Sequence, residues 1–151
     1  MPNWTMNTVT LKGIGANKAF YDDEGNFDFN KIIPEPESAE ECICKYGKRY
    51  IDDGTKHLQH NGTDDWFDWY GWHCAFWGTK WNACDTYIVS DDVVSFDTAW
   101  SAPEPIFEAL SKMYPNETLL VEASYEDGYD VTMKYTNGRL IYSDERVREE
   151  D

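Results

Sequence analysis

Few residues in this chain have the type and spacing that chemistry requires. Cys42 and Cys44, followed by His57 and His60, come nearest to a metal site, because they imitate a Cys2His2 zinc finger. Both internal spacings are one residue shorter than that pattern requires. Two helical positions that are two residues apart also do not face each other. We therefore expect no metal and no cofactor, with the cysteines packed and the histidines solvated.

Catalysis would need a poised nucleophile or an acid–base pair, and His73 beside Cys74 is the local candidate. Adjacent helical residues point about 100° apart, so these two do not form a dyad by themselves. Lys80 sits among aromatic residues, where a cation–π or carbonyl contact explains it more simply than a chemical role. The sequence contains no glycine-rich phosphate loop, nucleophile elbow or metalloprotease motif. It therefore predicts a protein that is not an enzyme and has no catalytic residues.

Acidic side chains dominate the composition. Twenty-nine aspartates and glutamates stand against thirteen lysines and arginines, which gives a formal net charge of −16. Residues 51–110 hold eleven of these acids, and their only bases are Lys56 and Lys80. Such a surface repels phosphate backbones, so we expect no direct binding to nucleic acid. It suits a basic protein partner, although acidity that serves only solubility is a common alternative.

Pairs of neighbouring acids in turn-rich segments are the candidate contacts with such a partner. These pairs are Asp52 and Asp53, Asp64 and Asp65, Asp91 and Asp92, and Glu126 and Asp127. Carboxylates can stand where phosphates would otherwise bind. We predict that the pairs contact a basic host or phage protein. One concrete version is charge mimicry that inhibits a nucleic-acid-binding protein of host defence.

The elements that must position these residues follow from hydrophobic periodicity. Five of the seven tryptophans lie between Trp66 and Trp81, and burying each is worth about 2–3 kcal/mol. That segment predicts an aromatic helix at the centre of the fold, ended by Gly78. Ser38 and Glu41 have the spacing of a capping box in front of another helix. The expected strands are 7–14, 86–90, 93–100, 119–125, 129–135 and 139–142, and the expected helices are 39–50, 66–77 and 104–113.

Strand, helix, two strands, helix and strand is the order of a ferredoxin-like fold. We therefore predict an α+β fold: a ferredoxin-like antiparallel sheet with two packed helices, an aromatic helical insert and a C-terminal β-hairpin extension. One domain spans residues 1–143, and the acidic tail 144–151 frays. The chain carries no apolar run near the roughly 18 residues of a membrane span. Its start lacks the regions of a signal peptide, so we expect a cytoplasmic protein.

Several blocks together resemble a known family. They are Met1-Pro2-Asn3-Trp4, residues 27–36, Trp77-Gly78-Thr79-Lys80-Trp81-Asn82-Ala83-Cys84-Asp85 and residues 96–105. This pattern is similar to the YubB-like ferredoxin-fold family of phage, prophage and plasmid proteins. Thr5 departs from the cysteine that the family often has there, which weakens a metal or redox role for that position. The resemblance implies a ferredoxin-like fold without an iron–sulfur cluster and an origin in a mobile element, but it supplies no reaction.

Three functions follow from these observations. The first is a non-catalytic acidic interaction protein of a mobile element, with the host-defence inhibitor as its concrete form. The second is an enzyme or small-ligand binder that uses a cleft near Trp72, His73 and Lys80. The third is a structural or regulatory phage component.

Overall fold

The computed structural model describes residues 3–46, 51–52, 66–67 and 69–148. Its elements, in chain order, are β1 (Trp4–Thr10), two short 3-10 turns η1 (Lys18–Phe20) and η2 (Phe29–Lys31), α1 (Ala39–Tyr46), β2 (Ile51–Asp52), β3 (Trp66–Phe67), α2 (Trp69–Phe76), β4 (Cys84–Ser90), β5 (Val93–Ala99), α3 (Glu104–Met113), β6 (Leu119–Tyr125), β7 (Tyr129–Thr136) and β8 (Arg139–Val147). No helix in these ranges combines the length and apolarity that crossing a bilayer needs.

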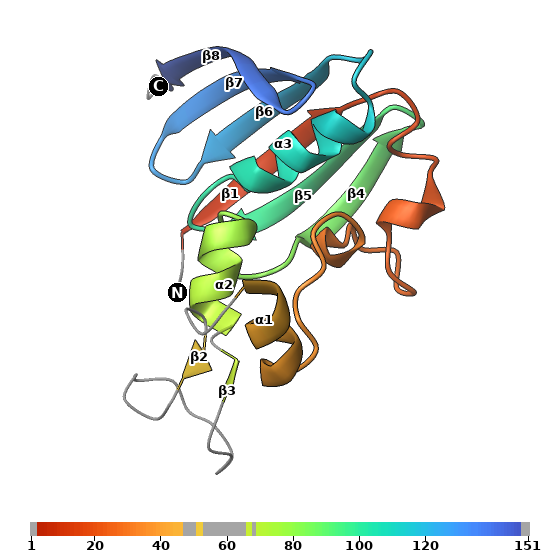
Figure 1. Ribbon diagram of the computed structural model, residues 1–151. Helices are drawn as coiled ribbons and strands as arrows, with labels where there is room; N and C mark the ends of the chain where they lie inside the picture. The colour runs from red at the N-terminus through yellow and green to blue at the C-terminus, as the bar shows by residue number, and fades with distance from the viewer. Residues whose placement is uncertain (1–2, 47–50, 53–65, 68, 149–151) are drawn as a thin grey trace.

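Six of the strands form one sheet in the order β4-β5-β1-β6-β7-β8, in which every neighbouring pair is antiparallel (Figure 1). β2 and β3 pair with each other in a separate two-stranded sheet. The strands β1, β4, β5 and β6 have the ferredoxin-like arrangement, with β1 between β5 and β6. The hairpin of β7 and β8 lengthens the sheet beside β6. The predicted α+β ferredoxin-like class and its hairpin extension are confirmed.

Alternation along the strands gives the sheet two different faces. In β1 the side chains of Thr5, Asn7 and Val9 are buried, whereas Met6 points to the other side and is exposed. The same alternation continues in β5 and β6. The helix α3 lies across the buried face, over the middle of the sheet (Figure 1). The opposite face carries exposed or half-buried side chains.

Aromatic side chains fill the space above β5. Phe27 stacks on Phe96 with ring centroids 4.9 Å apart, and Phe29 meets Trp77 edge to face at 5.6 Å. The indole N–H of Trp77 donates to the carbonyl oxygen of Ile33 at 2.9 Å, which satisfies its polar atom inside the core. The aromatic segment is thus anchored in the core at Trp77, and loops that are distant in sequence supply the contacting rings.

The capping box in front of α1 is present. Ser38 Oγ accepts the Glu41 N–H at 3.1 Å. The Glu41 carboxylate reaches back to the N–H of Glu37 at 2.6 Å, one residue earlier than the usual box.

The predicted helix 66–77 is wrong at its start. Trp66 and Phe67 form β3, paired with Ile51 and Asp52, and α2 begins only at Trp69. Cys74 is exposed, so α2 is not covered on both faces. Pairing with a distant strand overrides the helical period at Trp66, which no local pattern reveals.

Three further expectations differ from the structure. Trp100, the last residue of the expected strand 93–100, lies beyond the end of β5, because its backbone turns to a φ of +74° and its side chain is 43% exposed. β1 spans Trp4–Thr10, so it begins and ends earlier than the expected strand 7–14. β8 continues to Val147, five residues beyond the predicted end of the strand at Tyr142, so residues 144–147 of the expected frayed tail join the sheet.

Replacing Gly78 with alanine tests how closely α3 approaches the end of α2. Gly78 has a φ of +77°, and a Cβ there would lie 2.6 Å from Cδ of Pro105. Gly25 has a φ of +84° and open space around its Cβ position. Left-handed backbone costs an alanine about 1–2 kcal/mol at either site, and only Gly78→Ala adds an overpacking penalty of about 1–3 kcal/mol. We expect urea denaturation to show a larger loss of unfolding free energy for Gly78→Ala; equal losses would contradict the close approach.

Candidate functional site

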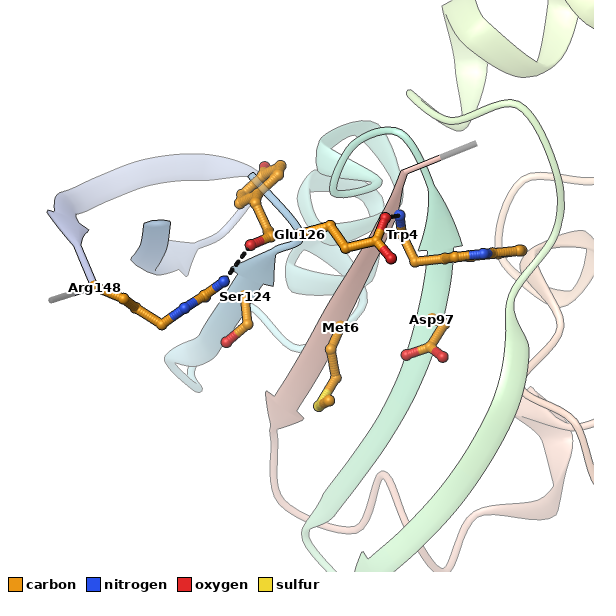
Figure 2. A pocket seen from close by; sticks show the side chains of 7 residues that line it. Trp4, Met6, Asp97, Ser124, Glu126 and Arg148 are labelled. Carbon is orange, nitrogen blue, oxygen red and sulfur yellow. Dashed lines mark hydrogen bonds between the residues drawn. The ribbon is translucent and has the colours of Figure 1, made fainter. Parts of the chain in front are cut away.

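A groove of about 440 Å³ opens on the face of the sheet opposite α3. Its lining comes from β1, β5, β6, the β6–β7 turn and the end of the described chain (Figure 2). The lining residues are Trp4, Met6, Asp97, Ser124, Tyr125, Glu126 and Arg148. Ligand pockets in proteins span roughly 300–1,000 Å³, so this groove can hold a side chain or a small molecule.

Strand register explains why these side chains converge. Met6 is directly opposite Asp97 on β5 and Ser124 on β6, and residues opposite each other in a sheet share a face. Figure 2 shows the three side chains on the same side of three neighbouring strands. The floor of the groove is therefore an apolar thioether between a carboxyl group and a hydroxyl group.

The acids of the β6–β7 turn fasten the start of β1. Glu126 Oε2 accepts the backbone N–H of Trp4 at 2.8 Å, and Asp127 Oδ1 accepts the side-chain N–H of Asn3 at the same distance. Figure 2 shows the Glu126 side chain reaching across to the amide of Trp4. These two carboxylates therefore hold the rim of the groove together as well as charging it.

Arg148 closes the far end of the groove and is itself neutralised. Its guanidinium donates to the carboxylate of Asp130 and to the carbonyl oxygens of Tyr125 and Tyr129. The rings of Tyr125 and Tyr129 stack with centroids 4.5 Å apart, which holds both carbonyl groups in place. Because its charge is paired with Asp130 and three of its five N–H donors bond within the protein, Arg148 is a fixed wall of the groove.

Asp97 forms a carboxyl pair with Asp85 at the edge of the groove. Burial, the negative charge of Asp85 and the hydrogen bond between the two side chains raise the pKa of Asp97 above its usual value. Cys84, opposite Asp97 on β4, has a thiol pKa raised by burial and by the same two carboxylates. A raised pKa keeps a thiol protonated and weakly nucleophilic. This wall of the groove can share a proton or attract a cation, and it holds no activated nucleophile.

An aromatic cluster continues from the groove at Trp4. Its indole lies 6.1 Å from that of Trp81. The Lys80 ammonium is 4.6 Å from the Trp81 ring centroid and 4.9 Å from that of Trp100. The cation–π contacts of Lys80 with these two indoles restrict the motion of all three side chains at the surface.

His73 has a structural environment. Its Nδ1 donates to the carbonyl oxygen of Lys80 at 2.8 Å, and its Nε2 lies 2.6 Å from Oε2 of Glu35. The imidazole stacks on Trp77 with centroids 4.1 Å apart and is 8% exposed. Trp72 is fully buried. Trp72, His73 and Lys80 do not line the groove, and the cleft expected near them stays a prediction.

The predicted acid pairs lie apart from one another. Glu126 and Asp127 sit at the β6–β7 turn, at one end of the sheet, and Asp91 and Asp92 sit at the β4–β5 turn, at the other. Asp92 Oδ1 accepts the N–H of Gly13 at 2.8 Å. For Asp52 the structure describes only the backbone, in β2, and Asp53, Asp64 and Asp65 lie outside the described residues. Among the pair residues whose side chains the structure describes, Glu126 is the one that lines the groove.

Sequence analysis missed the other groove residues. Asp97 and Met6 carried a usable signal, because each alternates with buried neighbours and so faces away from the core. Met6 is an apolar residue on the face that Thr8 and Thr10 share, which is typical of a contact surface. Arg148 carried no such signal, because the sequence predicted a frayed tail at this position and no strand that would bring it to the sheet.

Comparisons with known proteins agree with the fold. A family model described as the ferredoxin-like domain in Api92-like protein matches residues 76–151. The crystal structure of the protein api92 from Yersinia pseudotuberculosis is similar, with a TM-score of 0.51 at 16% sequence identity. The likeness covers 84% of this chain and 42% of that chain, so this chain spans less than half of that protein. No curated protein matches the chain. The comparisons leave the YubB-like resemblance without confirmation.

Replacing Asp97 with asparagine tests the carboxyl pair. A raised pKa means that the folded protein holds this proton more tightly than the unfolded chain, so ionised Asp97 destabilises the fold. The unfolding free energy therefore falls as pH rises from 3.8, the pKa of an unperturbed aspartate, through the higher pKa of Asp97 in the folded protein. We expect Asp97→Asn to increase the unfolding free energy in urea at pH 7, and the gain to vanish at pH 3. Asp91→Asn, at an exposed site of the same hairpin, controls for the general relief of negative charge; equal gains for both variants at pH 7 would contradict the pairing.

Proposed function

The chain belongs to the family of the ferredoxin-like domain in Api92-like protein, and we propose that this member of the family is a non-catalytic interaction module. It binds a basic protein on the face of the sheet opposite α3. The single observation that carries this proposal is the groove, in which an exposed apolar floor lies beside carboxyl groups. Large exposed apolar side chains within a polar rim are typical of protein contact sites.

The charges around the groove favour a basic occupant. Asp97 and Glu126 line it, and Glu122 projects from the same face of β6, two residues from Ser124. The cation of the lining, Arg148, is paired with Asp130. The net charge of −16 adds a long-range attraction for basic proteins and a repulsion for nucleic acid.

An aromatic ring beside carboxylates is suited to arginine and lysine side chains. A cation over an indole face gains about 0.5–2 kcal/mol, and a carboxylate adds a charge-assisted hydrogen bond. Trp4 stands at the rim between the groove and Trp81. A basic side chain that enters over Met6 would meet both kinds of contact.

The basic partner can be specified further from the origin that the resemblance implies. The resemblance to YubB-like proteins supports a mobile-element origin, and we expect the protein to act in the cytoplasm. For such an element, an acidic surface that competes with nucleic acid would inhibit a basic protein of host defence. The acid pairs at positions 52–53, 64–65 and 91–92 would extend the contact beyond the groove, and the structural phage component remains a competing assignment.

The experiment is capture of partners from a bacterial lysate on the immobilised protein, at low and at high salt, with identification by mass spectrometry. We expect a basic nucleic-acid-binding protein to be retained at low salt and lost at high salt, because screening weakens contacts between exposed charges. The variant Asp97→Lys with Glu122→Lys should lose this protein. Absence of any partner at both salts would shift the assignment to a small ligand.

A matched control variant carries Glu108→Lys with Glu117→Lys. Glu108 lies on α3 and Glu117 lies just before β6, both are exposed, and the change in net charge is the same. We expect the control to retain the partner. If both variants lose it equally, general charge and not the groove governs binding, and the proposal of a defined site is wrong.

A further inference from the structure

The outer strand β4 exposes apolar residues at its centre. Tyr87, Ile88 and Val89 are 67%, 48% and 53% exposed. β4 is one edge of the six-stranded sheet, as Figure 1 shows. Edge strands with exposed apolar side chains readily pair with another strand, and proteins usually protect them with lysine or proline. The sequence from Cys84 to Ser90 contains neither residue.

The phase of hydrogen bonding places the amide and carbonyl groups of Ile88 on the outer edge. Leu11 N–H donates to Asp92 O, and Trp100 N–H donates to Asn3 O, so even-numbered positions along β5 bond toward β1. Odd-numbered positions must then bond toward β4, because antiparallel pairing alternates.

A register shift lies between Ile88 and Ser90, but Tyr87 and Ile88 are in regular register with Ser95 and Val94. Ile88 is thus opposite an even-numbered position, so its own N–H and C=O point away from β5. In the part of the chain that the structure describes, no backbone hydrogen bond outside the sheet involves Ile88. These outward groups are available to an added strand.

A cavity of about 410 Å³ lies at the same place. Ile88 is the sheet residue that lines this cavity, and the other lining residues lie between positions 15 and 25. Tyr21 forms a firm wall, because its hydroxyl donates to the carbonyl oxygen of Ile14 at 2.9 Å and its ring packs edge to face on Phe27. The open backbone groups and the cavity that can receive a side chain therefore coincide.

The chain itself limits the length of the opening. Thr86 Oγ1 accepts the N–H of Phe27 at 2.9 Å, and Asp91 O accepts the N–H of Gly15 at 2.8 Å. Residues 15–27 thus meet the hairpin before and after the exposed centre. Between these contacts lie Tyr87, Ile88 and Val89, which suits a short extended peptide and not a long strand.

Charge decides between a second copy and a different partner. Two β4 strands that paired about Ile88 would bring Asp85 and Asp91 of one copy close to the same residues of the other, and like charges brought together across a strand pair are destabilising. Asp22 and Asp23 also line the cavity, where Lys18 is the basic lining residue. A peptide with basic residues on both sides of an apolar one would instead be attracted.

We infer that the β4 edge binds a short extended segment of a partner protein, with an apolar side chain in the cavity beside Ile88 and basic residues flanking it. The partner backbone pairs with the N–H and C=O of Ile88. This surface is separate from the groove of the proposed function, since the two cavities share no lining residue.

The test uses a fluorescently labelled synthetic peptide with a Val-Ile-Val centre and paired lysines at both ends, titrated with the full chain in fluorescence anisotropy. We expect saturable binding. A peptide N-methylated at the central isoleucine should lose about tenfold or more in affinity, because it cannot pair through that amide. A peptide with glutamates in place of the lysines should not bind.

Two protein variants locate the site. Ile88→Lys places a charge at the edge of β4, and Ile141→Lys makes the same change on β8, the opposite edge, where Ile141 is 58% exposed. We expect Ile88→Lys to weaken the peptide about tenfold or more and Ile141→Lys to leave it nearly unchanged. Circular dichroism and urea midpoints would establish that both variants fold.

The Asp97→Lys with Glu122→Lys variant separates this inference from the proposed function, because it should still bind the peptide. Three outcomes would overturn the inference. They are equal affinity of the Ile88→Lys and Ile141→Lys variants for the peptide, equal affinity of the wild type for the N-methylated and unmethylated peptides, and no binding of the peptide by the wild type. Sedimentation that detects a dimer abolished by Ile88→Lys would also overturn it, in favour of a second copy on this edge.

Discussion

The antiparallel pairing of β1 with β5 on one side and β6 on the other is the constraint on which the rest of the structure depends. It joins residues near position 5 to residues near positions 98 and 125, so the core cannot form until two long loops have closed. Register then decides which side chains meet. Val9 enters the core with Val94 and Val121, and Met6 on the opposite face meets Asp97 and Ser124. A shift of one residue in β1 would exchange these two sets and destroy the core and the groove together.

Much of the fold could be predicted because its signals are local. The bounds of α3 and β6 match the expected helix 104–113 and strand 119–125, since each element carries a clean period and clear turns. The wrong expectations share a different cause. Trp66 has the spacing of a helical face, yet it pairs with Asp52 across a segment that gives no local sign of it. Trp100 continues the alternation of β5, yet its backbone turns away at the end of the strand. In both cases tertiary pairing or a turn overrides periodicity.

The candidate site was harder to predict than the fold, because its lining residues span nearly the whole chain. Sequence alone could place Met6 and Asp97 on the face away from the core, but not beside each other, since register is not encoded in either strand by itself. The predicted contacts were pairs of neighbouring acids, and such pairs occur mostly in turns, where carboxylates are common because they bond to backbone N–H groups. Asp92 and Glu126 illustrate this: each accepts a backbone N–H from a segment far away in sequence. Their carboxylates hold the fold together before they can serve a partner.

The groove and the β4 edge share one physical design, and it explains how an acidic protein can bind selectively. At each surface an exposed apolar side chain, Met6 or Ile88, stands among carboxylates. Charge alone would attract any basic protein and would fail as salt rises. An apolar contact adds a short-range term that salt does not screen and that only a matching side chain satisfies. Acidity then governs how fast a basic partner arrives, and the apolar centre governs which partner stays.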